Sequence, residues 1–120
     1  MGELAGLRAL VVEDEGSVAL LIEAMLEELG CEVAASVATL AQAMTAATAE
    51  SFDFAVLDVN LAGELVFPVA EALRARQLPF VFSTGYGATA VPAAFRGYEV
   101  LNKPFILEEL ERKLCIATGK

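Results

Sequence analysis

Five side chains with the chemistry of an ion or phosphate site stand at the end of, or directly after, short apolar stretches of this sequence. They are Glu13, Asp14, Asp58, Thr84 and Lys103. If the fold brings the three carboxylates together, their negative charge is unfavourable unless a cation neutralises it. The sequence has no histidine and its two cysteines do not have metal-ligand spacing, so the ligands are all oxygen. Oxygen ligands suit Mg²⁺, Mn²⁺ or Ca²⁺.

A carboxylate held beside such a cation and a lysine is suited to accept a phosphoryl group. Aspartate carboxylates act as covalent nucleophiles of this kind. The cation and Lys103 would offset the charge on the transferring group at Asp58. The Thr84 hydroxyl could hydrogen-bond a phosphoryl oxygen, and the backbone carbonyl of Asn60 could supply a further metal ligand. The absence of histidine excludes Ser-His-Asp and Cys-His sites, and it means that the chain cannot itself carry a phosphohistidine.

Short apolar stretches alternate five times with segments of helical periodicity. The stretches that predict strands are residues 7–12, 31–36, 52–58, 78–84 and 98–102. The segments that predict helices are residues 17–29, 38–50, 63–76, 90–95 and 104–118, of which 90–95 favours only a short, poor helix. Pro68 falls in the first turns of the third helix, and Pro104 falls just before or at the first position of the last, where proline is tolerated. In that last helix, Ile106, Leu110 and Leu114 are expected to face inward.

This alternation predicts an α/β domain with a parallel sheet covered on both faces. Right-handed crossovers limit it to a doubly wound sheet, in which ligands lie beyond the carboxyl ends of the strands. The polar residues that follow the strands would therefore converge on one edge. With 120 residues and 57% hydrophobic composition, the chain fits one domain, residues 1–120, with a full core.

Charge and hydropathy exclude several classes of partner. The 17 acidic against 8 basic residues give a net charge of −9, which opposes binding to nucleic acid and to anionic membrane surfaces. The N-terminus lacks a signal-peptide pattern, and the uncharged run 77–95 contains prolines and glycines that rule out a membrane helix. Cys31 and Cys115 are expected to be small apolar side chains in a reducing compartment, so a cytoplasmic location is expected.

Four motifs in a fixed order carry a resemblance to a known family. They are VVEDE, VLDVN, FSTGYG and LNKPF. From about Gly6 to Ala117 the chain resembles the receiver domain of two-component response regulators. The resemblance implies a flavodoxin-like (βα)5 fold with strand order 2-1-3-4-5. It also implies a domain that is not an enzyme, apart from self-phosphotransfer and autodephosphorylation, and that receives its phosphoryl group from a histidine kinase or phosphotransfer protein.

The resemblance also assigns a metal and phosphate site to individual residues. Glu13 and Asp14 match the acidic pair of the family that holds Mg²⁺, and Asp58 matches the phosphoacceptor. Asn60 matches the residue whose main-chain carbonyl ligates the metal.

Two further matches concern the response to phosphorylation. Thr84 matches the switch hydroxyl of the family, and Lys103 matches the lysine that contacts the phosphoryl group. The bond between Lys103 and Pro104 is expected to be cis, as is common in the family.

The sequence departs from the usual family pattern in two places. Val100 stands where the family usually has an aromatic switch residue, and DVNLAGE lacks the usual proline after the acceptor. The segment PFVFSTGYG resembles instead a subgroup with a Pro-Phe-x-Phe-Ala-Thr-Gly motif, whose members are typically stand-alone and associated with HWE-type kinases. Tyr86 is our candidate for the replacement switch, because Gly85 and Gly87 give its loop backbone freedom.

The favoured hypothesis is a stand-alone phosphoacceptor whose phosphorylation at Asp58 changes a protein-binding face around the fourth helix and fifth strand. Its output would then be contact with a downstream protein target. One alternative is an aspartyl-phosphate phosphohydrolase, but such enzymes usually need a second aspartate where this chain has Asn60. Another alternative is a phosphorylation-independent adaptor.

Each site residue also has an ordinary structural explanation when it is considered alone. The acids at positions 13 and 14 could cap a helix, Asp58 could cap the next element, and Lys103 could be a surface lysine. The Thr84–Gly85 pair is common turn chemistry, and Tyr86 could be a half-exposed aromatic residue. The coincidence of the set at one edge favours the functional interpretation.

Overall fold

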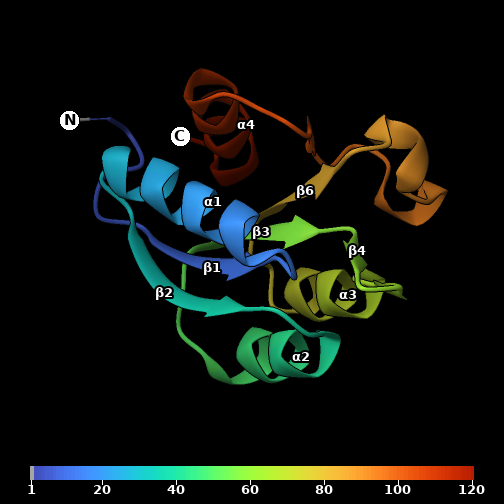
Figure 1. Cartoon of the computed structure of the whole chain (residues 1–120). Helices are drawn as coiled ribbons and strands as arrows, with labels where there is room; N and C mark the ends of the chain where they lie inside the picture. Colours follow the sequence, from blue (N-terminus) through green and yellow to red (C-terminus); the bar gives the residue numbers. More distant parts are fainter. Residues whose placement is uncertain (1) are drawn as a thin grey trace.

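The structure is a computed structural model that describes residues 2–120, with Ala88 described by its backbone alone. Strands and helices alternate along most of the chain (Figure 1). The strands are β1 (Arg8–Val12), β2 (Glu32–Val37), β3 (Phe54–Asp58), β4 (Asn60–Leu61), β5 (Glu64–Leu65), β6 (Phe80–Thr84) and β7 (Val100–Asn102). The α-helices are α1 (Gly16–Glu28), α2 (Leu40–Ala49), α3 (Phe67–Ala75) and α4 (Leu107–Thr118). Two 3-10 helices, η1 (Gly87–Ala90) and η2 (Ala93–Phe95), lie between β6 and β7.

The main sheet has five parallel strands in the order β2-β1-β3-β6-β7. Because β6 and β7 are its fourth and fifth strands along the chain, the expected order 2-1-3-4-5 is confirmed. Every residue of β3 and of β6 is buried, as expected for apolar strands covered on both faces. The edge strand β2 is only half-buried, which explains its weaker apolar pattern.

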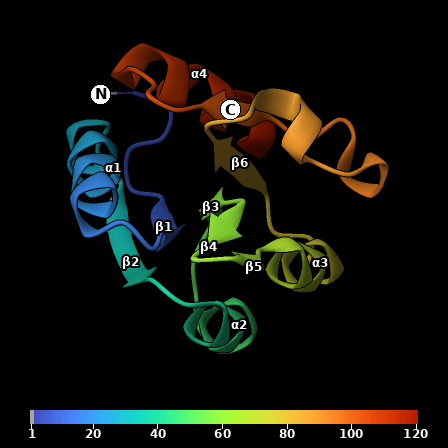
Figure 2. The same ribbon diagram turned by 45° about the vertical axis from the view of Figure 1, so that its right-hand side comes forward.

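Helices cover both faces of this sheet, as Figure 2 shows. Helices α1 and α4 cover one face, where Ile22, Leu26, Leu110 and Leu114 are buried in one apolar cluster. Helices α2 and α3 cover the other face, where a second cluster contains alanines of α2 and apolar residues of α3. The doubly wound architecture predicted from the alternation is therefore correct.

The segment after β3 differs from the prediction, because the third helix begins at Phe67 rather than at residue 63. Residues 60–65 instead form a small antiparallel hairpin of β4 and β5. Its turn residues, Ala62 and Gly63, have φ angles of 54° and 96°, which is typical of the two-residue turns that join antiparallel strands. The proline in α3 is at its first or second position, as predicted.

The segment between β6 and β7 forms the two 3-10 helices rather than the short α-helix predicted at residues 90–95. Pro92 lacks a backbone N–H and disfavours helical geometry in the residue before it, so a continuous helix is interrupted there. The buried ring of Phe95 then holds the segment on the core.

The last helix begins at Leu107, three residues later than the earliest predicted start. Ile106 precedes it and is 64% exposed, so the prediction that it faces inward is wrong. Leu110 and Leu114 are buried as predicted, because they lie one helical turn apart on the inner face. The bond between Lys103 and Pro104 is cis, as expected.

Cys31 and Cys115 are both free thiols. The Cys31 side chain is buried beside α1 and the Cys115 side chain is half-buried in α4, so each packs as a small apolar group. Among the described helices, residues 2–120, none has the length and hydropathy needed to cross a membrane.

Candidate functional site

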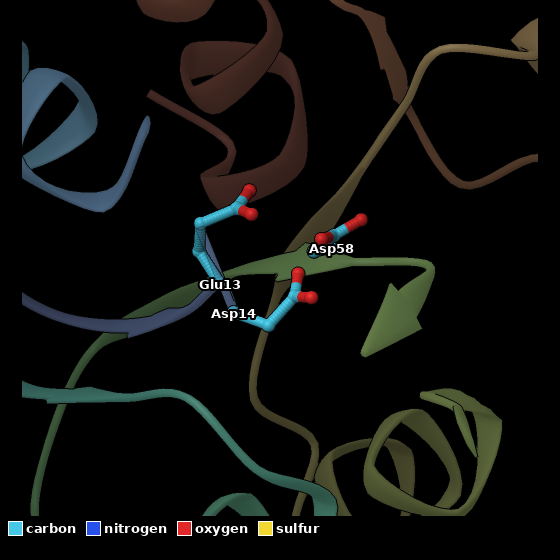
Figure 3. A group of neighbouring side chains, drawn as sticks. All are labelled: Glu13, Asp14 and Asp58. Carbon is cyan, nitrogen blue, oxygen red and sulfur yellow. The ribbon is translucent and has the colours of Figure 1, made fainter. Parts of the chain in front are cut away.

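Three carboxylates meet beyond the carboxyl ends of β1 and β3 (Figure 3). Glu13 and Asp14 directly follow β1, and Asp58 is the last residue of β3. Each residue offers a carboxylate oxygen, and these oxygens lie within 4.8 Å of one another. Glu13 and Asp58 are buried and Asp14 is half-buried, so the cluster lies at a sheet edge but is largely withdrawn from water.

Lys103 directly follows the outer strand β7, and its side chain reaches the cluster across the carboxyl edge of the sheet. Its ammonium nitrogen Nζ lies 2.8 Å from Glu13 Oε1 and 3.3 Å from Asp58 Oδ2. The backbone N–H of Lys103 donates to the Thr84 carbonyl at 2.9 Å, which continues the pairing of β6 with β7 beyond the last residue of β7. The sheet thereby fixes the direction in which the lysine leaves the backbone, and the predicted convergence of these residues is confirmed.

The electrostatics of the cluster are dominated by burial. Burial raises the pKa of the Asp58 carboxyl from its ordinary value of 3.8 to about 7, and a hydrogen bond with Asp14 and repulsion from Glu13 add to the rise. Attraction to Lys103 opposes part of that rise. Burial alone would lower the pKa of Lys103, but its contacts with Glu13 and Asp58 outweigh this effect and raise that pKa. Three carboxylates and one ammonium therefore leave the cluster with an excess of negative charge when all are ionised.

The donor set of this cluster fits a divalent cation. The three acids supply oxygen ligands only, which is the set that hard cations such as Mg²⁺ prefer. Asn60 is adjacent, because its backbone N–H donates to Asp58 Oδ1 at 3.3 Å. Its side-chain Oδ1 accepts from the Gly63 N–H at 2.6 Å, so the amide belongs to the hairpin turn. The ligand role of the Asn60 main-chain carbonyl stays a prediction.

A hollow of about 440 Å³ opens beside the cluster and provides access to Asp58. Its lining includes Asn60, Thr84, Tyr86 and Lys103. Thr84 is buried, and its Oγ1 accepts a hydrogen bond from the Tyr86 N–H at 3.1 Å, which leaves the hydroxyl proton free to be donated. The Tyr86 side chain is 81% exposed, so it projects into solvent at the rim of the hollow.

The chain that carries this acidic cluster is similar to known proteins. A family model described as the response regulator receiver domain matches residues 9–115. The chain belongs to this family. The Transcriptional regulatory protein TcrA of Mycobacterium tuberculosis is 37% identical over a match of 118 residues, and the match covers 94% of this chain and 46% of TcrA. The chain thus spans about half the length of the curated relatives it matches.

Two solved structures show the same receiver fold. The solution structure of SdrG from Sphingomonas melonis Fr1 has a TM-score of 0.84 and 40% identity, and the match covers 100% of both chains. The crystal structure of the receiver domain of the sensor histidine kinase PA1611 from Pseudomonas aeruginosa PAO1 has a TM-score of 0.81 and 30% identity, over 97% of this chain and 100% of that one. That neighbour has a magnesium ion coordinated in its active-site cleft. The acidic cluster of our receiver domain is consistent with a Mg²⁺ site.

The receiver domain also contains a polar residue near the site that the sequence analysis did not single out. Ser83 is 0% exposed and is paired in the sheet with Asp58. Its signal in the sequence is a hydroxyl residue that stands between the apolar run 80–82 and Thr84. Because Ser83 is paired with Asp58, the two side chains lie on the same face of the sheet.

Proposed function

We propose that this receiver domain accepts a phosphoryl group on Asp58 from a phosphohistidine of a partner kinase or phosphotransfer protein. The observation that carries the proposal is the position of the Asp58 carboxylate, which lies with two further carboxylates on one side and the Lys103 ammonium at 3.3 Å. The hollow beside Asp58 provides the space for a donor group to approach. Because the chain has no histidine, a donor phosphohistidine must lie outside it.

The proposed transfer forms one bond and breaks one. A carboxylate oxygen of Asp58 attacks phosphorus, and the bond between phosphorus and the donor imidazole nitrogen breaks. The imidazole nitrogen keeps the electron pair of that bond and takes up a proton. Such transfers depend mainly on positioning and on stabilisation of charge. Lys103 would hold a phosphoryl oxygen through its ammonium group, and the Thr84 hydroxyl would donate a hydrogen bond to another.

Glu13, Asp14, Asp58 and the main-chain carbonyl of Asn60 would hold Mg²⁺, or Mn²⁺ or Ca²⁺ in the same oxygen site. When bound, the cation supplies positive charge that offsets the charge of the phosphoryl oxygens. The acids at positions 13 and 14 are therefore needed to retain the ion, whereas Asp58 both contacts it and receives the phosphoryl group.

We further propose that phosphorylation is read out by protein contact at the face formed by η1, η2 and β7. The hydrogen bond from Tyr86 N–H to Thr84 Oγ1 links the proposed switch hydroxyl to the start of this face. Tyr86 is our candidate switch residue, and its exposed ring is available to a partner in the present state. The resemblance of PFVFSTGYG to the subgroup motif supports a stand-alone cytoplasmic regulator paired with an HWE-type kinase.

The competing hydrolase hypothesis lacks the acid that it requires. Asn60 stands at the position of that acid, and its side-chain oxygen already accepts the Gly63 N–H at 2.6 Å. An amide in this arrangement does not protonate a leaving group. The adaptor hypothesis leaves the buried cluster of acids without a role.

The proposal is tested by incubating the chain with a panel of autophosphorylated histidine kinases and phosphotransfer proteins in the presence of Mg²⁺. We expect labelled phosphoryl to move from at least one donor to the wild type and to Asp53→Asn, which removes an exposed carboxylate on the other end of β3. We expect no transfer to Asp58→Asn. Label on Asp58→Asn equal to that on the wild type would contradict the assignment of the acceptor.

A further inference from the structure

Strand β6 carries a buried hydroxyl group, that of Ser83. Ser83 is 0% exposed, and its Oγ makes no hydrogen bond within the part of the chain that the structure describes. Most buried polar side-chain atoms are hydrogen-bonded, and leaving one unpaired costs free energy. A state of the protein in which this hydroxyl has a hydrogen-bond partner would avoid that cost.

The sheet places Ser83 directly beside the phosphoacceptor. Strand β6 lies between β3 and β7, and Ser83 is paired with Asp58 on one side and Leu101 on the other. Paired residues of parallel strands point to the same face of the sheet. Because Leu101 packs in the apolar cluster under α1 and α4, the Ser83 side chain faces that layer as well.

Lys103 must cross β6 on this same face. It lies two residues beyond Leu101, and its ammonium reaches Asp58 on β3 and Glu13 beyond β1. Since neighbouring strands are about 4.8 Å apart, the side chain spans β6 on its way to β3. The positions on that face near the crossing are Ser83 of β6 and Gly85, which directly follows Thr84 at the end of β6, and both residues are small. Lys103 lines both the hollow beside Asp58 and an apolar hollow under α1, so space adjoins its side chain on both sides.

The present partners of the Lys103 ammonium include an acid that would ligate the cation. Its shortest contact, 2.8 Å, is with Glu13, which is one of the acids that would hold the cation. A Glu13 oxygen that ligates a cation is a weaker partner for an ammonium group. Lysine has three N–H donors, so loss of this contact leaves a donor that needs an acceptor.

We propose that Ser83 is a positioning residue whose hydroxyl accepts a hydrogen bond from the Lys103 ammonium when the cation occupies Glu13 and Asp14. This contact keeps the ammonium beside Asp58, where it meets the incoming phosphoryl group, and in that last respect the inference rests on the proposed function. The side chain at position 83 is small, so it also leaves room for the Lys103 side chain to cross β6. The Ser83 hydroxyl thus becomes the acceptor for the Lys103 ammonium once the contact of that ammonium with Glu13 is lost.

The first test follows the Lys103 side chain by NMR without any phosphoryl donor. The sequence has three lysines, Lys103, Lys113 and Lys120, so labelled lysine gives few signals. Between wild type and Ser83→Ala, we expect similar Lys103 Cε and Nζ signals without Mg²⁺ and clearly different ones with saturating Mg²⁺. The matched control Ser36→Ala removes an exposed sheet hydroxyl and should follow the wild type in both states. Equal Mg²⁺-induced shifts in wild type and Ser83→Ala would overturn the inference.

The second test measures phosphoryl uptake from phosphoramidate at saturating Mg²⁺. Loss of one hydrogen bond to the lysine should slow uptake by Ser83→Ala about 3- to 10-fold. In a Lys103→Met background the same substitution should change the rate by less than about 2-fold, because the effect acts through Lys103. An equal slowing in both backgrounds, or none in the first, would overturn the inference. If the wild type takes up no phosphoryl group, the proposed function fails, and the NMR test still decides the role of Ser83.

Thermal unfolding separates this role from a defect in folding. Ser83→Ala removes a hydroxyl that is unpaired in the metal-free protein, so its melting midpoint without Mg²⁺ should equal or exceed that of the wild type. A lower midpoint would show that the hydroxyl already stabilises the metal-free fold, and it would contradict the proposed change of partners.

Discussion

The ionised carboxyl of Asp58 is unfavourable in the metal-free fold. The group is buried beside Glu13 and Asp14, and the contact with Lys103 offsets only part of this cost. The same arrangement becomes favourable when a divalent cation enters, because its charge offsets that of the carboxylates. At the scale of the residue, the negative charge of Asp58 therefore lowers the stability of the metal-free fold at the position where that charge is needed to bind a cation.

The first prediction concerns the pH dependence of stability in EDTA. Between the unfolded pKa of Asp58, near 3.8, and its folded pKa, about 7, the folded state keeps a proton that the unfolded state releases. The free energy of unfolding of the wild type should therefore fall as pH rises through this window. Asp58→Asn has no carboxyl to ionise at this position, so it should be more stable than the wild type at pH 8, by on the order of 1–3 kcal/mol.

Urea denaturation of both proteins at several pH values between 4 and 8 measures this difference. The control Asp53→Asn removes an exposed carboxylate outside the cluster and leaves Asp58 in place, so the fall in stability attributed to Asp58 should remain. Addition of Mg²⁺ should restore part of the wild-type stability at pH 8, because ligand binding to the folded state stabilises it. Parallel profiles for wild type and Asp58→Asn would show that this carboxyl is not perturbed.

The second prediction concerns the link between Thr84 and Tyr86. The Thr84 Oγ1 accepts the Tyr86 N–H, so a hydroxyl that turns toward a phosphoryl group should carry the loop with it. Phosphorylation should shift the Tyr86 amide signal in the wild type and in Thr84→Ser. In Thr84→Val the shift should fall by more than half, and stability should fall by about 1 kcal/mol. An undiminished shift in phosphorylated Thr84→Val would exclude the hydroxyl as the link.

At the scale of the element, aromatic packing replaces helix formation between β6 and β7. The η2 helix has three residues and cannot be stable alone. The Phe95 ring stacks on Phe67 with centroids 5.7 Å apart and meets Phe82 edge-on at the same distance. The guanidinium carbon of Arg74 lies 4.4 Å from the centre of the Phe95 ring. The Phe95 side chain therefore helps to hold the segment that we propose as part of the output face, together with the hydrogen bond that Arg74 donates to the Ala94 carbonyl at 2.7 Å.

The third prediction follows from this packing. Phe95→Ala should lower the free energy of unfolding by about 3–5 kcal/mol, because it removes a buried aromatic side chain. Phe95→Leu retains much of the apolar volume and should cost less, about 1–2 kcal/mol. Urea denaturation measures both values. Mg²⁺ affinity of the folded Phe95→Leu protein should stay within about 3-fold of the wild type, since the ring is not among the residues that line the site. A cost below about 1 kcal/mol for Phe95→Ala would mean that the segment is held elsewhere.

The elements that sequence reasoning predicted best are those defined by long periodic patterns. The strands with buried apolar runs and the helices α1 and α4 were predicted closely, because their periodicity extends over whole elements. The β4–β5 hairpin was missed because two-residue strands have no detectable period, and the apolar residues before Phe67 were assigned to the helix. The inward direction assigned to Ile106 was wrong because the helix begins one residue after it.

The candidate site was predictable for a different reason. Glu13, Asp14 and Lys103 follow strands and Asp58 is the last residue of one, and topology alone brings strand ends to one edge. Ser83 was not predictable in the same way. The sequence shows only a hydroxyl residue in an apolar strand. Its significance depends on burial, on the missing hydrogen-bond partner among the described residues and on the path of the lysine, which only the structure shows.

At the scale of the whole molecule, two apolar layers hold the sheet rigid, and the charged site is confined to one edge. The net charge of −9 adds a general negative field to the local excess at the cluster. This field attracts divalent cations and basic partner surfaces and repels anionic donors that arrive without a cation. A cation requirement for phosphorylation is therefore expected from the whole molecule as well as from the three acids.

The most direct test of the central claim is an intact-mass measurement after incubation with phosphoramidate and Mg²⁺. We predict a mass gain of one phosphoryl group on the wild type and on Asp53→Asn, stable in acid and lost in base. The gain should be absent in EDTA and in Asp58→Asn. A wild type that gains no mass, or an Asp58→Asn protein that gains it equally, would contradict the assignment of this carboxylate as the phosphoacceptor.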